Sequence, residues 1–159
     1  MLHYTTTDIV FQEIPDEVTL AINISGCPCR CPGCHSPQLW NNIGSDLDSE
    51  SLQDIIAPYA NSISTVAFMG GDAEPEVINC LAKAMHVRFP RLKAAWWSGR
   101  THLSPKIDLC NFNYIKLGPY LAHLGPLRSP TTNQRLYKVV SNSLHDITYQ
   151  YRRLSQSKI

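Results

Sequence analysis

Four of the six cysteines of this chain lie within one short loop, and thiols so closely spaced can bind metal. The loop reads Gly-Cys-Pro-Cys-Arg-Cys-Pro-Gly-Cys-His over residues 26–35. Disulfides that stabilise a small protein are usually spread along its chain, so this crowding favours a metal site. Two kinds of site remain open: a structural zinc ion held by four thiolates, and an iron–sulfur cluster held by three.

The Cys-x3-Cys-x2-Cys spacing of Cys27, Cys31 and Cys34 suits a cubane cluster better than a zinc tetrahedron. Structural zinc usually joins two separated Cys-x-x-Cys pairs, whereas this sequence offers one such pair without a distant partner. Three thiolates would each bind one iron of a 4Fe-4S cluster and leave the fourth iron open to a ligand. The prolines and the glycine between the cysteines suit a tight loop that wraps such a cluster.

The other three cysteines are not required by this spacing. We interpret Cys29 as a bystander near the cluster. Cys80 falls on the apolar face of a predicted helix and Cys110 in a loop before a strand, so both are expected to be small buried residues rather than ligands. The sequence contains no arrangement of paired carboxylates or of Ser, His and Asp that indicates a general base, so no catalytic side chain is predicted.

Hydrophobic patterning predicts the strands and helices that position this loop. Short apolar runs rich in β-branched residues indicate strands, and apolar residues at helical spacing indicate helices. The expected strands span residues 19–24, 64–69, 93–97, 113–117 and 136–140, and the expected helices span 49–59, 74–89 and 145–154. Alternating strands and helices predict an α/β fold with a mainly parallel sheet. The chain is shorter than the roughly 200 residues that a closed eight-stranded barrel needs, so we expect a partial, open βα barrel.

Four unusual loops follow these predicted strands. The first is the cysteine loop, and the others are Gly70-Gly71-Asp72, Ser98-Gly99-Arg100 and Gly118-Pro119. Sites in parallel α/β folds gather beyond the carboxyl ends of the strands. We therefore expect the four loops to meet on one face of the protein.

Length and composition restrict the classes of function. The 159 residues suit a single domain over 1–159. With a formal net charge of +1 and no long basic run, the chain lacks the electrostatic pattern of a nucleic-acid-binding protein. No apolar run approaches the roughly 20 residues that span a bilayer, and the N-terminus lacks a signal-peptide pattern. We expect a cytoplasmic protein that does not bind membranes, in which cysteines serve metal or redox chemistry.

The order of the motifs resembles a known family. Cys-x3-Cys-x2-Cys after a first strand resembles the radical S-adenosylmethionine superfamily. Further segments are similar, in order, to the activating proteins of anaerobic ribonucleoside-triphosphate reductases: 26–37 (GCPCRCPGCHSP), 68–75 (FMGGDAEP), 114–120 (YIKLGPY) and 129–137 (SPTTNQRLY). The run Thr131–Arg135 is the most specific to that family, whereas the cysteine motif alone indicates only the superfamily.

The resemblance implies two cofactors. Cys27, Cys31 and Cys34 would hold a 4Fe-4S cluster whose open iron binds the amino and carboxylate groups of S-adenosylmethionine. The position before the third cysteine, aromatic in many superfamily members, is Gly33, as in the reductase activators. Contacts to the adenine are therefore implied for Gly33, Cys34 and His35, partly through the backbone.

The resemblance also assigns roles to the loops after the second and third predicted strands. Gly70, Gly71 and Asp72 match the superfamily's Gly-Gly-Glu motif, which lines the methionine amino group. Asp72 keeps the charge of the usual glutamate but shortens its reach. Ser98 is expected near the carboxylate of the ligand, where Arg100 could assist.

Finally, the resemblance implies an oxidoreductase that activates another enzyme. Flavodoxin or ferredoxin would reduce the cluster, and S-adenosylmethionine would be cleaved to methionine and a 5′-deoxyadenosyl radical. That radical would take a hydrogen atom from a glycine of anaerobic ribonucleoside-triphosphate reductase, near a surface that includes Thr131–Arg135. The alternatives are an activase of another glycyl-radical enzyme, an enzyme that modifies a small molecule, a zinc-binding module, and an electron carrier with Cys29 as a fourth ligand.

Overall fold

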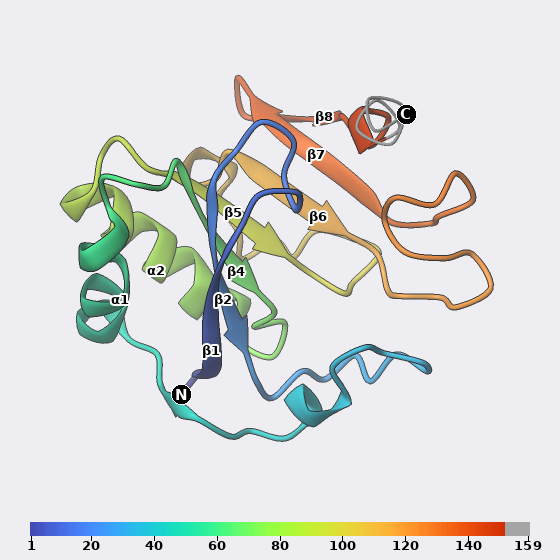
Figure 1. Ribbon diagram of the computed structural model, residues 1–159, viewed down its shortest axis with the longest axis horizontal. Helices are drawn as coiled ribbons and strands as arrows, with labels where there is room; N and C mark the ends of the chain where they lie inside the picture. The colour runs from blue at the N-terminus through green and yellow to red at the C-terminus, as the bar shows by residue number, and fades with distance from the viewer. Residues whose placement is uncertain (152–159) are drawn as a thin grey trace.

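Residues 1–151, the part of the chain that the computed structural model describes, contain one eight-stranded sheet in the order β3-β1-β2-β4-β5-β6-β7-β8 (Figure 1). The strands are β1 His3–Val10, β2 Thr19–Ile24, β3 Ser45–Asp46, β4 Thr65–Met69, β5 Lys93–Trp97, β6 Tyr114–Leu117, β7 Arg135–Val140 and β8 Ser143–Asp146. The α-helices are α1 Ser49–Ile56 and α2 Pro75–Arg88, and short 3-10 helices span η1 Pro37–Trp40, η2 Ala57–Tyr59 and η3 Leu109–Asn111. Within these residues, no helix has the length and apolar character needed to cross a bilayer.

The sheet is mixed, so the predicted mainly parallel partial βα barrel is wrong. Among the described residues, only β2, β4, β5 and β6 pair in parallel, and four of the seven strand pairings are antiparallel. Parallel neighbours need a crossover connection of about a dozen residues or more, usually with a helix. The chain instead reverses directly from β1 to β2 and from β7 to β8. The second reversal is a two-residue turn in which Ser141 and Asn142 both adopt positive φ, which produces a hairpin.

The predicted elements themselves are mostly confirmed. All five expected strands are present, with bounds within one residue of the prediction. The helix expected over 49–59 is α1 followed by η2, and it begins at a capping box in which the Asp48 carboxylate accepts the Ser51 N–H. The predicted helix over 145–154 is wrong at its start, because β8 includes His145 and Asp146. Gln150 and Tyr151 are helical, and the rest of that segment lies outside the described residues.

The two faces of the sheet are covered differently. One face packs against α1 and α2, where side chains from the parallel strands meet the apolar face of each helix (Figure 1). The largest fully buried side chains of this core include Trp96, Phe68, Ile22, Ile78 and Met85. On the opposite face, a smaller cluster contains Ile14, Ala67, Ala95, Tyr114, Leu136, Ile147 and Tyr151. The first core fixes the register of the parallel strands, because a slip of one residue would expose it.

A buried carboxylate joins the amino-terminal ends of the parallel strands. Glu17, only 6% exposed, accepts hydrogen bonds from Ser64 Oγ at 2.5 Å and Thr65 Oγ1 at 2.9 Å through one oxygen. Its other oxygen accepts from Lys93 Nζ at 2.5 Å and from the Tyr114 hydroxyl at 3.0 Å. Burial alone would raise the pKa of Glu17, but these hydrogen bonds outweigh it and hold the pKa below its usual value.

This network predicts a pH-dependent contribution to stability. Because the pKa of Glu17 is lowered in the folded state, its contribution is present above the usual carboxyl pKa of 4.5 and is lost as the pH falls through the lower folded pKa. Replacing Glu17 with Gln should lower the free energy of unfolding at neutral pH by about 2 kcal/mol, because the amide accepts weaker hydrogen bonds than the buried carboxylate while the partner Lys93 stays 45% exposed. The difference from the wild type should shrink below pH 4.5.

Urea unfolding followed by circular dichroism under anaerobic conditions would measure both effects. Glu76→Gln is the matched control, because Glu76 forms an exposed ion pair with Lys106 and should contribute little. Equal stability of Glu17→Gln and the wild type at neutral pH would contradict the role given to this network.

Candidate functional site

The carboxyl ends of the four parallel strands lie side by side, and each is followed by one of the four loops singled out in the sequence. Figure 1 shows the segment with the cysteines leaving the end of β2 on the side toward which β4, β5 and β6 also point. Direct contacts join the loops. Cys29 and Ser98 both contact Asp72, and the Gly118 N–H donates to the Arg100 carbonyl at 2.7 Å. The structure therefore brings these loops into one site.

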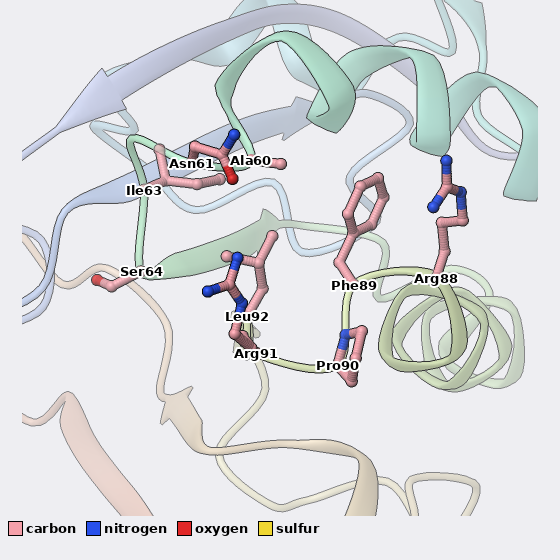
Figure 2. Close-up of a pocket in the computed structure, with 9 residues that line it drawn as sticks. All are labelled: Ala60, Asn61, Ile63, Ser64, Arg88, Phe89, Pro90, Arg91 and Leu92. Carbon is pink, nitrogen blue, oxygen red and sulfur yellow. The ribbon is translucent and has the colours of Figure 1, made fainter.

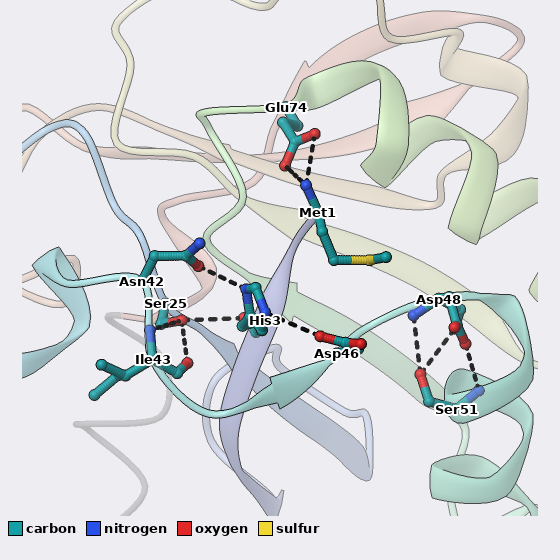
Figure 3. A network of polar contacts seen from close by, with 9 residues as sticks. All are labelled: Met1, His3, Ser25, Asn42, Ile43, Asp46, Asp48, Ser51 and Glu74. Atoms are coloured by element: carbon teal, nitrogen blue, oxygen red, sulfur yellow. Dashed lines mark hydrogen bonds and ion pairs between the residues drawn. The ribbon is translucent and has the colours of Figure 1, made fainter.

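Polar contacts at its base fix both ends of the cysteine loop (Figure 3). The Ser25 hydroxyl donates to the Ile43 carbonyl at 2.5 Å and accepts the Ile43 N–H at 3.1 Å. His3 of β1 contacts Asn42 Oδ1 at 2.8 Å through Nδ1 and Asp46 Oδ1 at 2.9 Å through Nε2. The antiparallel strands β1 and β3, absent from the prediction, thus hold the segment that carries the thiols.

The loop itself bends sharply between the cysteines. Gly33 adopts a φ of 77° and Arg30 one of 44°, and the Cys34 N–H donates to the Cys31 carbonyl at 3.0 Å. The Cys27 N–H is bound to the Leu39 carbonyl at 2.9 Å. Glycine at position 33 adopts this positive φ without steric cost, whereas a residue with a side chain would be strained there.

The four thiols of the loop are partly buried and form no disulfide. Interaction with the neighbouring Cys29 thiol lowers the pKa of Cys27 to about 6, although burial and the charge of Asp72 oppose the shift. The same contact, together with burial, raises the pKa of Cys29. The thiolate is the form that binds iron, so the lowered pKa of Cys27 favours a ligand at this position.

The donor set of the loop consists of thiols, which suit an iron–sulfur cluster. Among residues 1–151, no group of three or more His, Cys, Asp or Glu side chains converges as it would around one metal ion. Thiolates that each bind a different iron need not meet at one point, and sulfur is the ligand that iron–sulfur clusters require. By their spacing, Cys27, Cys31 and Cys34 stay the predicted ligands of such a cluster.

Asp72 lies at the centre of the contacts between the loops. Asp72 is only 8% exposed, and its Oδ1 accepts a hydrogen bond from the Ser98 hydroxyl at 2.5 Å. The other oxygen, Oδ2, accepts from the Gly99 N–H at 2.8 Å and from Cys29 Sγ at 3.6 Å. A methyl group on Gly71 would lie 2.5 Å from Ile78 of α2, so only glycine allows the preceding turn to approach the helix.

A buried cation faces the same site. Lys116, left without a role in the sequence analysis, is 7% exposed and donates from Nζ to the Gly118 carbonyl at 2.7 Å and the Ser98 carbonyl at 3.3 Å. Burial lowers its pKa to about 8, while the negative charge of Asp72 and of the cysteines opposes the shift. In the sequence, Lys116 lies between apolar neighbours in a predicted strand. That pattern fits a lysine facing a ligand site, and it fits equally a lysine at the edge of the sheet.

The remaining predicted residues take different positions. His35 is exposed and packs its ring edge-to-face against Tyr120, with 5.1 Å between the ring centroids, so the loop after β6 covers part of the cysteine loop. The prediction that Cys80 and Cys110 are buried is wrong, since both are exposed. Cys80 lies outside the buried stripe of α2, which consists of Ile78, Leu81, Ala82 and Met85.

Two pockets differ in their relation to this site. A pocket of about 520 Å³ adjoins it and includes Asp72, Trp96, Arg100 and His102. A pocket of about 740 Å³ lies at the amino-terminal ends of β4 and β5, where Ser64, Arg88 and Leu92 are among its lining residues (Figure 2). Because this second pocket opens at the opposite end of the strands, it is separate from the cysteines.

The thiol loop and the geometry around it define an iron–sulfur cluster protein. A family model described as a 4Fe-4S single cluster domain matches residues 18–110, more than half of the chain, and the chain belongs to this family. The matched region runs from the start of β2 to η3 and includes the cysteine loop, Asp72 and Ser98. No curated protein and no solved structure gives a significant match.

This assignment predicts the iron content of cysteine variants. After anaerobic reconstitution, the wild type should hold about four iron and four sulfide atoms per chain. Replacing Cys27, Cys31 or Cys34 with Ala should remove most of the cluster and its brown absorbance. The exposed Cys80→Ala and Cys110→Ala are matched controls and should keep full iron content. One zinc ion in a colourless wild-type protein would contradict the assignment.

Proposed function

We propose that this iron–sulfur protein is a glycyl-radical activating enzyme that cleaves S-adenosylmethionine. Three thiolates leave one iron of a 4Fe-4S cluster without a protein ligand. Beside them, the structure gathers a buried carboxylate, a buried hydroxyl and a buried ammonium, those of Asp72, Ser98 and Lys116. This combination is the observation that supports the proposal, because an amino acid ligand presents an ammonium and a carboxylate of opposite charge.

The side chains have separate tasks in this proposal. When bound, the cluster supplies the electron that breaks the bond between sulfur and C5′ of S-adenosylmethionine. The Asp72 carboxylate pairs with the methionine ammonium. Ser98 and Gly99 hold the Asp72 carboxylate in place by donating hydrogen bonds to it. Lys116 offsets the negative charge that thiolates and carboxylate bring to the site. None of these residues acts as a general base.

The proposed reaction balances through the transfer of one hydrogen atom. One electron from flavodoxin or ferredoxin and one S-adenosylmethionine give methionine and a 5′-deoxyadenosyl radical. The radical takes a hydrogen atom from a glycine of anaerobic ribonucleoside-triphosphate reductase, which leaves 5′-deoxyadenosine and a glycyl radical. We place this reaction in the cytoplasm.

Thr131–Arg135 supports a partner surface next to the site. Thr132 and Gln134 are buried, and Asn133 donates to the Pro119 carbonyl at 3.1 Å, so the segment packs on the loop after β6. Thr131 and Arg135 flank these anchors and are exposed. A segment held on the loop after β6, the loop whose Tyr120 contacts His35, suits contact with the reductase that carries the glycine.

The central experiment assays 5′-deoxyadenosine. The reconstituted protein, dithionite and S-adenosylmethionine are mixed anaerobically, and the expected products are 5′-deoxyadenosine and methionine in equal amounts. The triple variant with Ala at positions 27, 31 and 34 is the control. Intact cluster content without product would reject the proposal and favour an electron carrier.

The partner is tested by electron paramagnetic resonance. With the anaerobic reductase present, the reaction should produce a glycyl-radical doublet, and a reductase with Ala in place of its radical glycine should not. Formation of 5′-deoxyadenosine without any doublet would indicate a different glycyl-radical enzyme or a small-molecule substrate.

Asp72→Asn tests the proposed ammonium contact. The variant keeps the shape of the side chain but removes its charge, so KM for S-adenosylmethionine should rise by about tenfold or more. Iron content should not change, because Asp72 is not a ligand. An unchanged KM would show that Asp72 only joins the loops.

A further inference from the structure

Cys29 points out of the cysteine loop and toward the next two loops. Its Sγ lies 3.6 Å from Asp72 Oδ2, across 43 residues of sequence. It also lies against Gly99, where an added methyl group would meet Sγ at 2.9 Å and Cys29 Cβ at 3.3 Å. The thiol is therefore packed between the loops that follow β4 and β5.

The Asp72 carboxylate receives its donors from two different loops. Ser98 and Gly99 come from the loop after β5, and Cys29 comes from the cysteine loop. The hydrogen bond from Cys29 is thus the one of these three that couples the carboxylate to the residues that would hold the cluster. A carboxylate fixed from both sides is restricted in rotation, so its position relative to the cluster is set.

We propose that Cys29 is a positioning residue that ties the cysteine loop to Asp72 and so orients this carboxylate toward the ammonium of S-adenosylmethionine. The inference rests on the proposed function for its ligand. It replaces the interpretation of Cys29 as a bystander, and it excludes a fourth cluster ligand, which would have to turn Sγ away from Asp72. The thiol donates a hydrogen bond and undergoes no covalent step.

The first test compares Cys29→Ala with Cys29→Ser, since serine restores a donor of similar size. Both variants should keep the wild-type iron content. The dissociation constant for S-adenosylmethionine, measured from its effect on the electron paramagnetic resonance spectrum of the reduced cluster, should rise about five- to tenfold in Cys29→Ala. It should stay within about twofold of the wild type in Cys29→Ser.

The outcomes separate this inference from the proposed function. A wild-type spectrum that does not respond to S-adenosylmethionine would reject the proposed function and, with it, the orienting role. If the wild type responds, loss of iron in Cys29→Ala would identify a cluster ligand, and an unchanged dissociation constant would identify a bystander. Cys110→Ala is the matched control, because its thiol is exposed and remote in the fold.

A second test measures the contact directly in the reconstituted full chain. Gly99→Ala should lower the melting temperature by about 3–6 °C, because the new methyl group meets the Cys29 sulfur. The same substitution in a Cys29→Ala background should cost at most about half as much. Equal losses in the two backgrounds would show that Cys29 does not pack against Gly99, and would overturn the proposal independently of any ligand.

Discussion

The buried carboxylate of Asp72 is the interaction on which the site depends. Removing a charge from water is costly unless hydrogen-bond donors replace the lost solvent. Here the donors are Ser98, Gly99 and Cys29, which belong to two loops far apart in the sequence. The charge can be buried only when those loops are correctly placed, so the same contact that stabilises Asp72 also fixes the geometry of the site. Lys116, buried nearby, adds the opposite charge.

The two ends of the parallel strands have different roles. Parallel pairing of β2, β4, β5 and β6 places four carboxyl ends at one edge, where the loops meet. At the other ends of the strands, Glu17 joins residues from the same region of the sheet through four hydrogen bonds. Antiparallel strands extend the sheet on both flanks, and His3 of β1 helps Ser25 to hold the base of the cysteine loop.

Membership of the 4Fe-4S single cluster domain family accounts for the thiols, and the proposed activity depends on what surrounds them. A cluster with an unliganded iron and no neighbouring charges would have nothing to recognise an amino acid ligand. In this protein, the adjoining loops carry a carboxylate and a hydroxyl, β6 carries an ammonium, and Tyr120 packs against His35. The site therefore combines a place for a cluster with polar groups suited to a charged ligand.

The sequence by itself indicated an iron–sulfur cluster and the central strands, because cysteine spacing and short apolar runs such as residues 19–24 are local properties. It did not reveal β1, whose threonine-rich strand is only partly buried, nor the hairpin of β7 and β8. Without those reversals, the alternating pattern favoured a parallel barrel. Only the tertiary structure decided the partner of Cys29 and the burial of Lys116, because both depend on which strand ends lie next to each other. Such contacts between distant residues follow from the order of strands in the sheet, which no local pattern encodes.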